Sequence, residues 1–390
     1  MIEREMAEYI KYAATKYPVV TITGPRQSGK TTLAKNLFPD KEYLSLEDMD
    51  MREFAIQDPR GFLSRFTNGA VIDEAQRAPD LFSYIQTHVD KSNKVGEFIL
   101  TGSQNFLLLN KVSQSLAGRV AIAHLLPFSN CELMQAKIIH NNPFELIYKG
   151  FYPRVQVLNI EPHEWYGNYI ATYLERDVRQ IQNIVDISKF RTFMKLCAGR
   201  VGQIVNFSAI GNECGVDHST IKAWMSVLEA SFIIYLLRPY HNNLGKRLVK
   251  QPKLYFYDTG IASCLLGIDH PVTLDFHHMK GALFENYVIS ELIKERFNKG
   301  KNNNLYFWRD HNGNEVDCII DKMKPTAIEI KSGQTITNDF FKGLNYWKKT
   351  TGFDDRRLVH GGNIKDSRFG VEVKPWNDFR EICESDSQII

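Results

Sequence analysis

Residues 24–31 read Gly-Pro-Arg-Gln-Ser-Gly-Lys-Thr, and this stretch decides the fold of the N-terminal part of the chain. It follows a run of β-type residues, 19–23, and leads into a helix-compatible run, 32–37. A strand, a loop with the spacing G-x-x-x-x-G-K-[ST] and a helix, in that order, are typical of a phosphate-binding loop. The glycines let backbone N–H groups turn toward a phosphate, and the N-terminus of the helix adds a favourable field.

We expect Lys30 to reach the β- and γ-phosphates of a nucleotide and the Thr31 hydroxyl to ligate magnesium. Lys30 is therefore also a candidate catalytic residue. The residues expected to contact the nucleotide are Gly24, Pro25, Arg26, Gln27, Ser28, Gly29, Lys30, Thr31 and Thr32.

Two acids, Asp73 and Glu74, follow the apolar run 70–72. At the end of a second buried strand, Asp73 would hold Mg²⁺ and Glu74 would orient or polarise a water molecule. This pair favours hydrolysis over transfer to a substrate hydroxyl, as in a small-molecule kinase; a solvated strand end is the alternative. Because the sequence has no Asn-Lys-x-Asp motif for guanine, we expect ATP and Mg²⁺ as the cofactors.

Further polar residues lie at the ends of the next two β-type runs. Thr101 or Ser103 is placed to sense the γ-phosphate, and Arg119 directly precedes the run 120–125. Arg119 is a candidate arginine finger for the site of a neighbouring subunit, which would imply a homo-oligomer, or it forms a structural salt bridge.

The chain of 390 residues is long enough for two or three domains, and its net charge of +3 is small. Six cysteines without a Cys-x-x-Cys pair favour reduced thiols, and the absence of a signal peptide or a long apolar run predicts a cytoplasmic protein without a membrane span. Strands alternating with helices predict an α/β domain with a parallel sheet. The five β-type runs are 19–23, 42–46, 70–72, 97–101 and 120–125.

Eight motifs together resemble one family of prokaryotic AAA-like ATPases, part of the AAA+ superfamily. The motifs are GPRQSGKTTL, DEAQRAPDL, LTGSQ, LAGR, PFSNCE, YLERDV, KLYFYDTG and GALFENYV. The C-terminal half of that family is a domain of unknown function that ends in a restriction-endonuclease-like unit. The resemblance implies an AAA+-like P-loop core, an α-helical winged-helix domain and a small α/β domain with a PD-(D/E)xK fold, either active or degenerate.

Residues 207–224 read as a helix, a glycine-containing turn and a second helix, with Asp217 as the N-cap of the second. Ile221, Met225 and Leu228 would line its buried face. His218, Ser219 and Lys222 would face outward, where a recognition helix meets DNA. The following hairpin would contact phosphates; its basic and aromatic residues are Arg238, Tyr240, His241, Lys246, Arg247, Lys250 and Lys253. Alternatively, this module packs on the ATPase domain or mediates subunit contacts.

Four C-terminal residues match the D…E-x-K core of restriction-type nucleases: Glu285 on a helix, Asp317 on one strand, and Glu329 and Lys331 on another. Asn312-Gly313 predicts the hairpin turn before Asp317. The acids could ligate a divalent ion, and the lysine could stabilise charge on a phosphodiester. A cross-strand ion pair in an inactive fold is the alternative.

These observations predict four regions: an ATPase domain over residues 1–160, a linking helix over 161–187, a winged helix over 188–265 and a nuclease-like domain over 275–390. The leading hypothesis is an ATPase that binds DNA, with a metal-dependent nuclease. The rival is a nucleotide-controlled switch or scaffold that binds protein partners and whose nuclease-like fold is inactive.

Overall fold

The computed structural model describes residues 2–103, 115–174, 186–240 and 251–378. The chain forms two compact units. The first contains residues 1–128 with 230–232 and 296–302, and the second contains residues 129–229, 233–295 and 303–390. Within the described ranges, no helix combines the length and the apolar character needed to cross a membrane.

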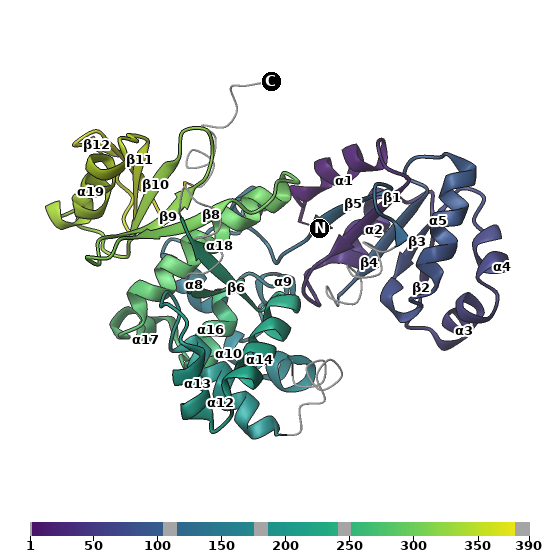
Figure 1. Ribbon diagram of the computed structural model, residues 1–390, viewed down its shortest axis with the longest axis horizontal. Helices are drawn as coiled ribbons and strands as arrows, with labels where there is room; N and C mark the ends of the chain where they lie inside the picture. The colour runs from purple at the N-terminus through teal and green to yellow at the C-terminus, as the bar shows by residue number, and fades with distance from the viewer. Residues whose placement is uncertain (1, 104–114, 175–185, 241–250, 379–390) are drawn as a thin grey trace. The chain divides into compact units, whose positions relative to one another are not determined.

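The first unit is built on a five-stranded sheet in the order β2-β3-β4-β1-β5, in which every neighbouring pair is parallel (Figure 1). The strands are β1 (Val19–Thr23), β2 (Glu42–Ser45), β3 (Ala70–Asp73), β4 (Phe98–Gly102) and β5 (Val120–His124). The parallel sheet predicted from the sequence is confirmed, and the strand ends shift by a single residue at most. Because the strands are parallel, their carboxyl ends meet at one edge of the sheet.

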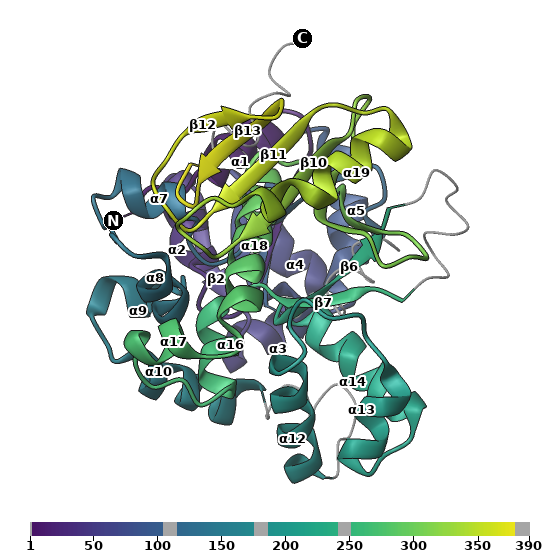
Figure 2. The same ribbon diagram turned by 90° about the vertical axis from the view of Figure 1, so that its left-hand side faces the viewer.

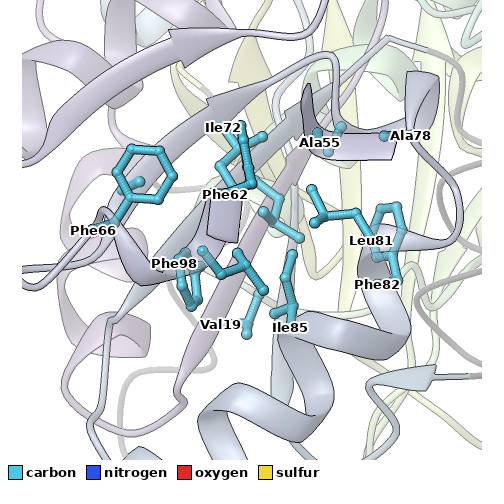
Figure 3. Packing of buried hydrophobic residues seen from close by; sticks show 14 of the residues in the cluster. Val19, Ala55, Phe62, Phe66, Ile72, Ala78, Leu81, Phe82, Ile85 and Phe98 are labelled. Carbon is cyan, nitrogen blue, oxygen red and sulfur yellow. The ribbon is translucent and has the colours of Figure 1, made fainter. Parts of the chain in front are cut away.

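Successive side chains of a strand point to opposite faces of the sheet. Both faces of this sheet are buried. Val19, Ile72 and Phe98 belong to the core on one face (Figure 3), while Val20 and Ile22 belong to the core on the other. Residues of α3, α4 and α5 complete the first core, and residues of α1 and α2 complete the second. The helical elements are α1 (Met6–Ala14), α2 (Lys30–Leu37), α3 (Met49–Gln57), α4 (Pro59–Ser64), η1 (Ala75–Arg77) and α5 (Leu81–Ser92).

The second unit begins with a mainly helical region. Its helical elements are α7 (Asn130–Gln135), α8 (Pro143–Lys149), α9 (Pro153–Leu158), α10 (Pro162–Tyr169), η2 (Ile170–Leu174), α12 (Ile187–Ala198), α13 (Phe207–Cys214), α14 (His218–Ala230), α16 (Thr259–Leu265) and α17 (Pro271–Phe276). Within residues 161–187, where the sequence predicts a linking helix, the structure has α10 and η2, and residues 175–185 lie outside the described ranges.

An eight-stranded sheet runs through the second unit in the order β12-β13-β11-β10-β9-β8-β6-β7; Figure 2 shows β10 to β13 with α19. Its strands are β6 (Ile234–Pro239), β7 (Lys253–Phe256), β8 (Leu305–Arg309), β9 (Glu315–Ile320), β10 (Thr326–Lys331), β11 (Arg356–His360), β12 (Asp366–Arg368) and β13 (Val371–Pro375). The accompanying helical elements are α18 (Lys280–Asn298), η3 (Asn338–Phe341) and α19 (Lys342–Thr351). Because β6 pairs in parallel with β8, the β6–β7 hairpin and the C-terminal strands share one sheet.

One buried amide fixes α18 against β7. The Oδ1 of Asn286 accepts a hydrogen bond from the backbone N–H of Phe256, and its Nδ2 donates to the carbonyl of Phe256, both at 2.7 Å. Paired in this way, a fully buried amide satisfies its own polar groups and those of the strand. The contact holds the neighbouring Glu285 beside the side chains of β7.

Candidate functional site

The loop between β1 and α2 turns its backbone through conformations that side chains rarely adopt. Gly24, Gln27 and Gly29 have φ of 150°, 60° and 96°. A Cβ at Gly24 would lie 2.1 Å from the carbonyl oxygen of Leu125, so only glycine fits there. With α2 beginning at Lys30, the loop has the form of a phosphate cradle at the start of a helix.

The side chain of Lys30 folds back into this loop. Its Nζ donates to the carbonyl oxygens of Gly24, at 3.0 Å, and Pro25, at 2.7 Å. Burial lowers the pKa of Lys30 to about 8, although the charges of Glu74 and Asp73 oppose this shift. These carbonyls hold the ammonium group inside the loop, where phosphate oxygens could replace them as acceptors.

Asp73, at the end of β3, is the point where side chains from three other elements meet. Thr31 of α2 donates to its Oδ2 at 3.0 Å, Tyr43 of β2 donates to the same oxygen at 2.9 Å, and Thr101 of β4 donates to Oδ1. Burial and the charge of Asp73 raise the pKa of Tyr43, so its phenol stays protonated and acts as the donor. The carboxylate and the Thr31 hydroxyl are hard oxygen ligands that fit Mg²⁺.

Glu74 follows β3 in the left-handed region, with φ 53° and ψ 43°. Its Oε2 accepts from Ser103 Oγ at 3.1 Å and from Gln76 Nε2. Left-handed backbone costs a non-glycine residue on the order of 1–3 kcal/mol and is concentrated at functional sites. Here it turns the carboxylate toward the end of β4, where Ser103 lies.

The structure thus brings Lys30, Thr31, Asp73, Glu74 and Ser103 to one edge of the sheet. Sequence reasoning missed Tyr43, Gln76 and Arg4. The other predicted loop residues occupy different environments: Pro25 and Ser28 are buried, Arg26 is partly buried, and Gln27 and Thr32 are exposed.

Arg4 supports the phosphate-binding loop from just before α1. Its Nη1 donates to the carbonyl of Ser28 at 2.7 Å, and its Nη2 donates to the carbonyl of Leu126 at 2.6 Å. The guanidinium also lies over the ring of Phe128, at 4.9 Å from the centroid. Arg4 ties the loop to the chain after β5, and no local motif marks it because it lies 24 residues before Ser28.

Arg119 lies at the opposite edge of the sheet from this site. Its neighbour Val120 pairs with Val19, the first residue of β1. The phosphate-binding loop instead follows Thr23, the last residue of β1. Nε and Nη2 of Arg119 donate to the two carboxylate oxygens of Asp90, at 2.5 and 3.0 Å. The salt bridge that was the alternative for Arg119 is present, and its role toward another subunit stays a prediction.

A second group of charged residues lies in the second unit. Lys331 Nζ is 2.5 Å from Glu329 Oε1 and 3.6 Å from Asp317 Oδ2. Glu285 Oε1 accepts from the hydroxyl of Tyr255 and lies 3.4 Å from Lys253 Nζ. Lys253 also pairs with Glu315 of β9.

This cluster is buried enough to shift the protonation of its acids. Burial, and then the charge of Asp317, raise the pKa of Glu285 to about 7 and that of Glu329 to about 8. Burial acts in the opposite direction on Lys253, but the surrounding carboxylates, with Glu285 first, raise its pKa above the ordinary value. The charge of Asp317 and then that of Glu329 likewise outweigh burial and raise the pKa of Lys331, so both lysines are charged at neutral pH.

A divalent metal does not fit this cluster as it stands. The charges of Glu285, Asp317, Glu329 and Lys331 act on one another, and their role as a nuclease site stays a prediction. However, the described residues contain no group of three or more His, Cys, Asp or Glu side chains arranged to hold one ion. The ammonium groups of Lys253 and Lys331 lie against carboxylates that a cation would need as ligands.

The helix pair α13 and α14 has the predicted arrangement of faces. Ile221, Met225 and Leu228 are buried, and His218, Ser219 and Lys222 are exposed. The carboxylate of Asp217 caps α14 by accepting from the backbone N–H of Thr220 at 2.8 Å.

The basic hairpin differs from its prediction at two positions. Lys253 does not face solvent to contact phosphates; it is 3% exposed and pairs with Glu285 and Glu315. Tyr240 is also buried and packs against Trp347. Arg238 is exposed, and four residues of the prediction, His241, Lys246, Arg247 and Lys250, lie outside the described residues.

Comparisons with known protein families match three successive regions of the chain. Residues 16–134 match a family model described as an AAA domain, while residues 141–271 and 280–379 match two domains of unknown function, DUF8612 and DUF4143. Uncharacterised proteins of Mycobacterium tuberculosis and Mycobacterium bovis are each 30% identical over 338 residues, which cover 85% of this chain and 74% of the relative. This chain belongs to the same family as these mycobacterial proteins, and its residues 16–134 belong to the AAA domain family.

Other proteins that the comparisons found are less similar to this chain. An uncharacterised protein of Haemophilus influenzae is 23% identical, over 76% of this chain and 80% of the relative. The Walker-type ATPase PABY2304 of Pyrococcus abyssi is 15% identical, with a TM-score of 0.46, 68% of this chain and 96% of that one covered. AMPPCP-bound DnaA of Aquifex aeolicus is 16% identical, with a TM-score of 0.32 and coverage of 57% and 85%.

The lowered pKa of Lys30 predicts that nucleotide affinity depends on pH. Above pH 8, Lys30 of the nucleotide-free protein loses its proton and must regain it to pair with phosphate. The affinity for nucleotide should therefore fall by about tenfold per pH unit above pH 8. This fall should end at the pKa that Lys30 has in the nucleotide complex. Titration of a fluorescent ATP analogue between pH 6.5 and 9.5 measures this dependence.

The Lys30→Arg variant is the matched control because its guanidinium stays charged throughout this range. Its affinity should vary little with pH. An equally flat profile for the unaltered protein would contradict the assigned role of Lys30.

Proposed function

We propose that this chain binds ATP with Mg²⁺ at the loop formed by residues 24–31 and hydrolyses it. One observation carries the proposal: the Thr31 hydroxyl lies 3.0 Å from the Asp73 carboxylate, and Glu74 is the next residue. Thr31 and Asp73 would hold the magnesium ion, which supplies positive charge against the β- and γ-phosphates.

The remaining residues of the site have separate roles in hydrolysis. Lys30 exchanges the carbonyl oxygens of Gly24 and Pro25 for phosphate oxygens, and backbone N–H groups of the loop bind the rest of the triphosphate. Glu74 accepts a proton from the attacking water as the new P–O bond forms and the bond between the γ-phosphorus and the β-bridging oxygen breaks. Ser103 and Gln76 hold the Glu74 carboxylate until water and nucleotide are present.

Replacing Glu74 by glutamine tests its role as the base. The amide keeps the size of the side chain and cannot accept the proton, so turnover should fall by about 10²- to 10⁴-fold while ATP still binds. Phosphate release under single-turnover conditions measures the rate, and a filter assay with labelled ATP measures binding.

The matched control is Glu47→Gln, which changes a 52% exposed glutamate that pairs with Arg77. It should keep the full rate. If Glu74→Gln hydrolyses ATP as fast as Glu47→Gln, Glu74 is not the base.

We further propose that the second unit binds nucleic acid through α14 and does not cut it. The support for binding is the exposed start of α14, where His218, Ser219 and Lys222 face solvent. The support for the absence of cutting is Lys253, which lies outside the D…E-x-K pattern and pairs with Glu285, one of the carboxylates that a nuclease would need for metal. This combines the DNA-binding hypothesis with the inactive nuclease-like fold of the rival hypothesis.

An experiment with supercoiled plasmid and Mg²⁺ separates the two activities. We expect the plasmid to be retarded in a gel, more weakly as salt rises, and to remain supercoiled. Lys222→Ala should weaken the retardation because it removes a phosphate contact.

Lys349→Ala, at an exposed position of α19, is the matched control and should bind plasmid like the unaltered protein. Plasmid nicking that needs Mg²⁺ and disappears in Lys331→Ala would contradict the proposal of an inert cluster. Retardation that is insensitive to salt and to Lys222→Ala would contradict the proposal for α14.

A further inference from the structure

A cavity of about 670 Å³ lies at the carboxyl ends of parallel strands in the second unit. Strand β11 is parallel to both β10 and β13, and the pairs Lys331 with His360 and His360 with Pro375 align the last residues of all three. The segments that leave these ends, 334–336, 361–364 and Trp376, line the cavity. In open α/β sheets, this edge is where ligands bind.

The lining is polar and can both donate and accept hydrogen bonds. Residues with primary amide side chains line the cavity from three segments of the chain, and Arg368 is also among the lining residues. The amides belong to Asn141, Asn142, Gln334 and Asn363. Among the described residues that line it there is no carboxylate, so the cavity favours a ligand with negative charge. Its volume is in the range of about 300–1,000 Å³ that is usual for small-molecule sites.

Close packing of the backbone fixes one wall of this cavity before any ligand binds. A Cβ at Gly361 would lie 2.3 Å from the carbonyl oxygen of Ser332, and one at Gly362 would lie 3.0 Å from that of Gln334. The buried His360 accepts from the N–H of Gly362 at Nδ1 and lies 2.9 Å from the carbonyl of Ile364 at Nε2. This pattern assigns the proton to Nε2 and fixes the loop over residues 361–364.

We propose that this cavity binds a nucleotide, either as a free mononucleotide or as one unit of a single strand. Amide side chains pair with the adjacent donors and acceptors on a base edge, and a guanidinium matches the geometry of phosphate. Arg368 pairs with Asp366 at 2.7 Å, and both side chains are 40% exposed, so a phosphate can share the guanidinium. This site would be distinct from the phosphate-binding loop, because all its residues belong to the second unit.

The test uses the full chain with Lys30→Ala, which removes the phosphate contact of the first site. Isothermal titration with AMP, CMP, GMP, UMP and a six-residue oligothymidylate should give binding by at least one of these probes. Ribose 5-phosphate, which has no base, should bind at least about tenfold more weakly, because base contacts of about 1.4 kcal/mol correspond to that factor.

Two further changes locate the binding. Gln334→Ala and Asn363→Ala, both at exposed loop positions, should each weaken it by about tenfold or more, which again corresponds to about 1.4 kcal/mol. Asn212→Ala on α13, also exposed, is the matched control and should leave it unchanged. Binding by mononucleotides identifies a free ligand, and binding by the oligonucleotide alone identifies a strand. No binding at millimolar concentration, equal binding of ribose 5-phosphate, or no effect of either substitution would overturn the proposal.

Discussion

The carboxylate of Asp73 is the constraint on which the nucleotide site depends. It receives hydroxyl hydrogen bonds from α2, β2 and β4, so its position fixes the spacing of three elements beside β3. A buried carboxylate is costly unless its oxygens are paired. The parallel sheet makes this pairing possible because the ends of β1, β3 and β4 all reach the same edge.

Buried acids are treated differently in the second unit. Around Asp73 the partners are neutral hydroxyls, which leave room for an added cation. Around Asp317 the partners are the ammonium group of Lys331 and the backbone N–H of Ile330. Where the protein supplies its own positive charge, a second cation gains less on binding. The cluster around Asp73 therefore suits an added cation better than the cluster around Asp317, although both contain a buried acid of a strand.

Local patterns accounted for the parts of the structure that depend on neighbouring residues. The loop over residues 24–31, the acids at the end of β3 and the five parallel strands could be predicted because motif spacing and apolar runs determine them. The buried face of α14 followed from helical periodicity for the same reason. Tyr43 and Arg4 could not be found in this way, since each reaches its partner across the fold and nothing in the adjacent sequence marks the contact.

Lys253 shows most clearly which contacts could not be predicted from the sequence. Its position in the sequence grouped it with the basic residues on the surface of a hairpin, but its partners, Glu285 and Glu315, come from α18 and β9. Charge along a sequence does not reveal which acids the fold will bring near.

The claim that Asp73 holds the magnesium of a bound nucleotide is central to this account. Isothermal titration of ATP with and without Mg²⁺, in the unaltered protein and in Asp73→Asn, tests it directly. We expect Mg²⁺ to strengthen ATP binding in the unaltered protein and to have no effect on the variant. An equal gain from Mg²⁺ in both proteins would contradict the account.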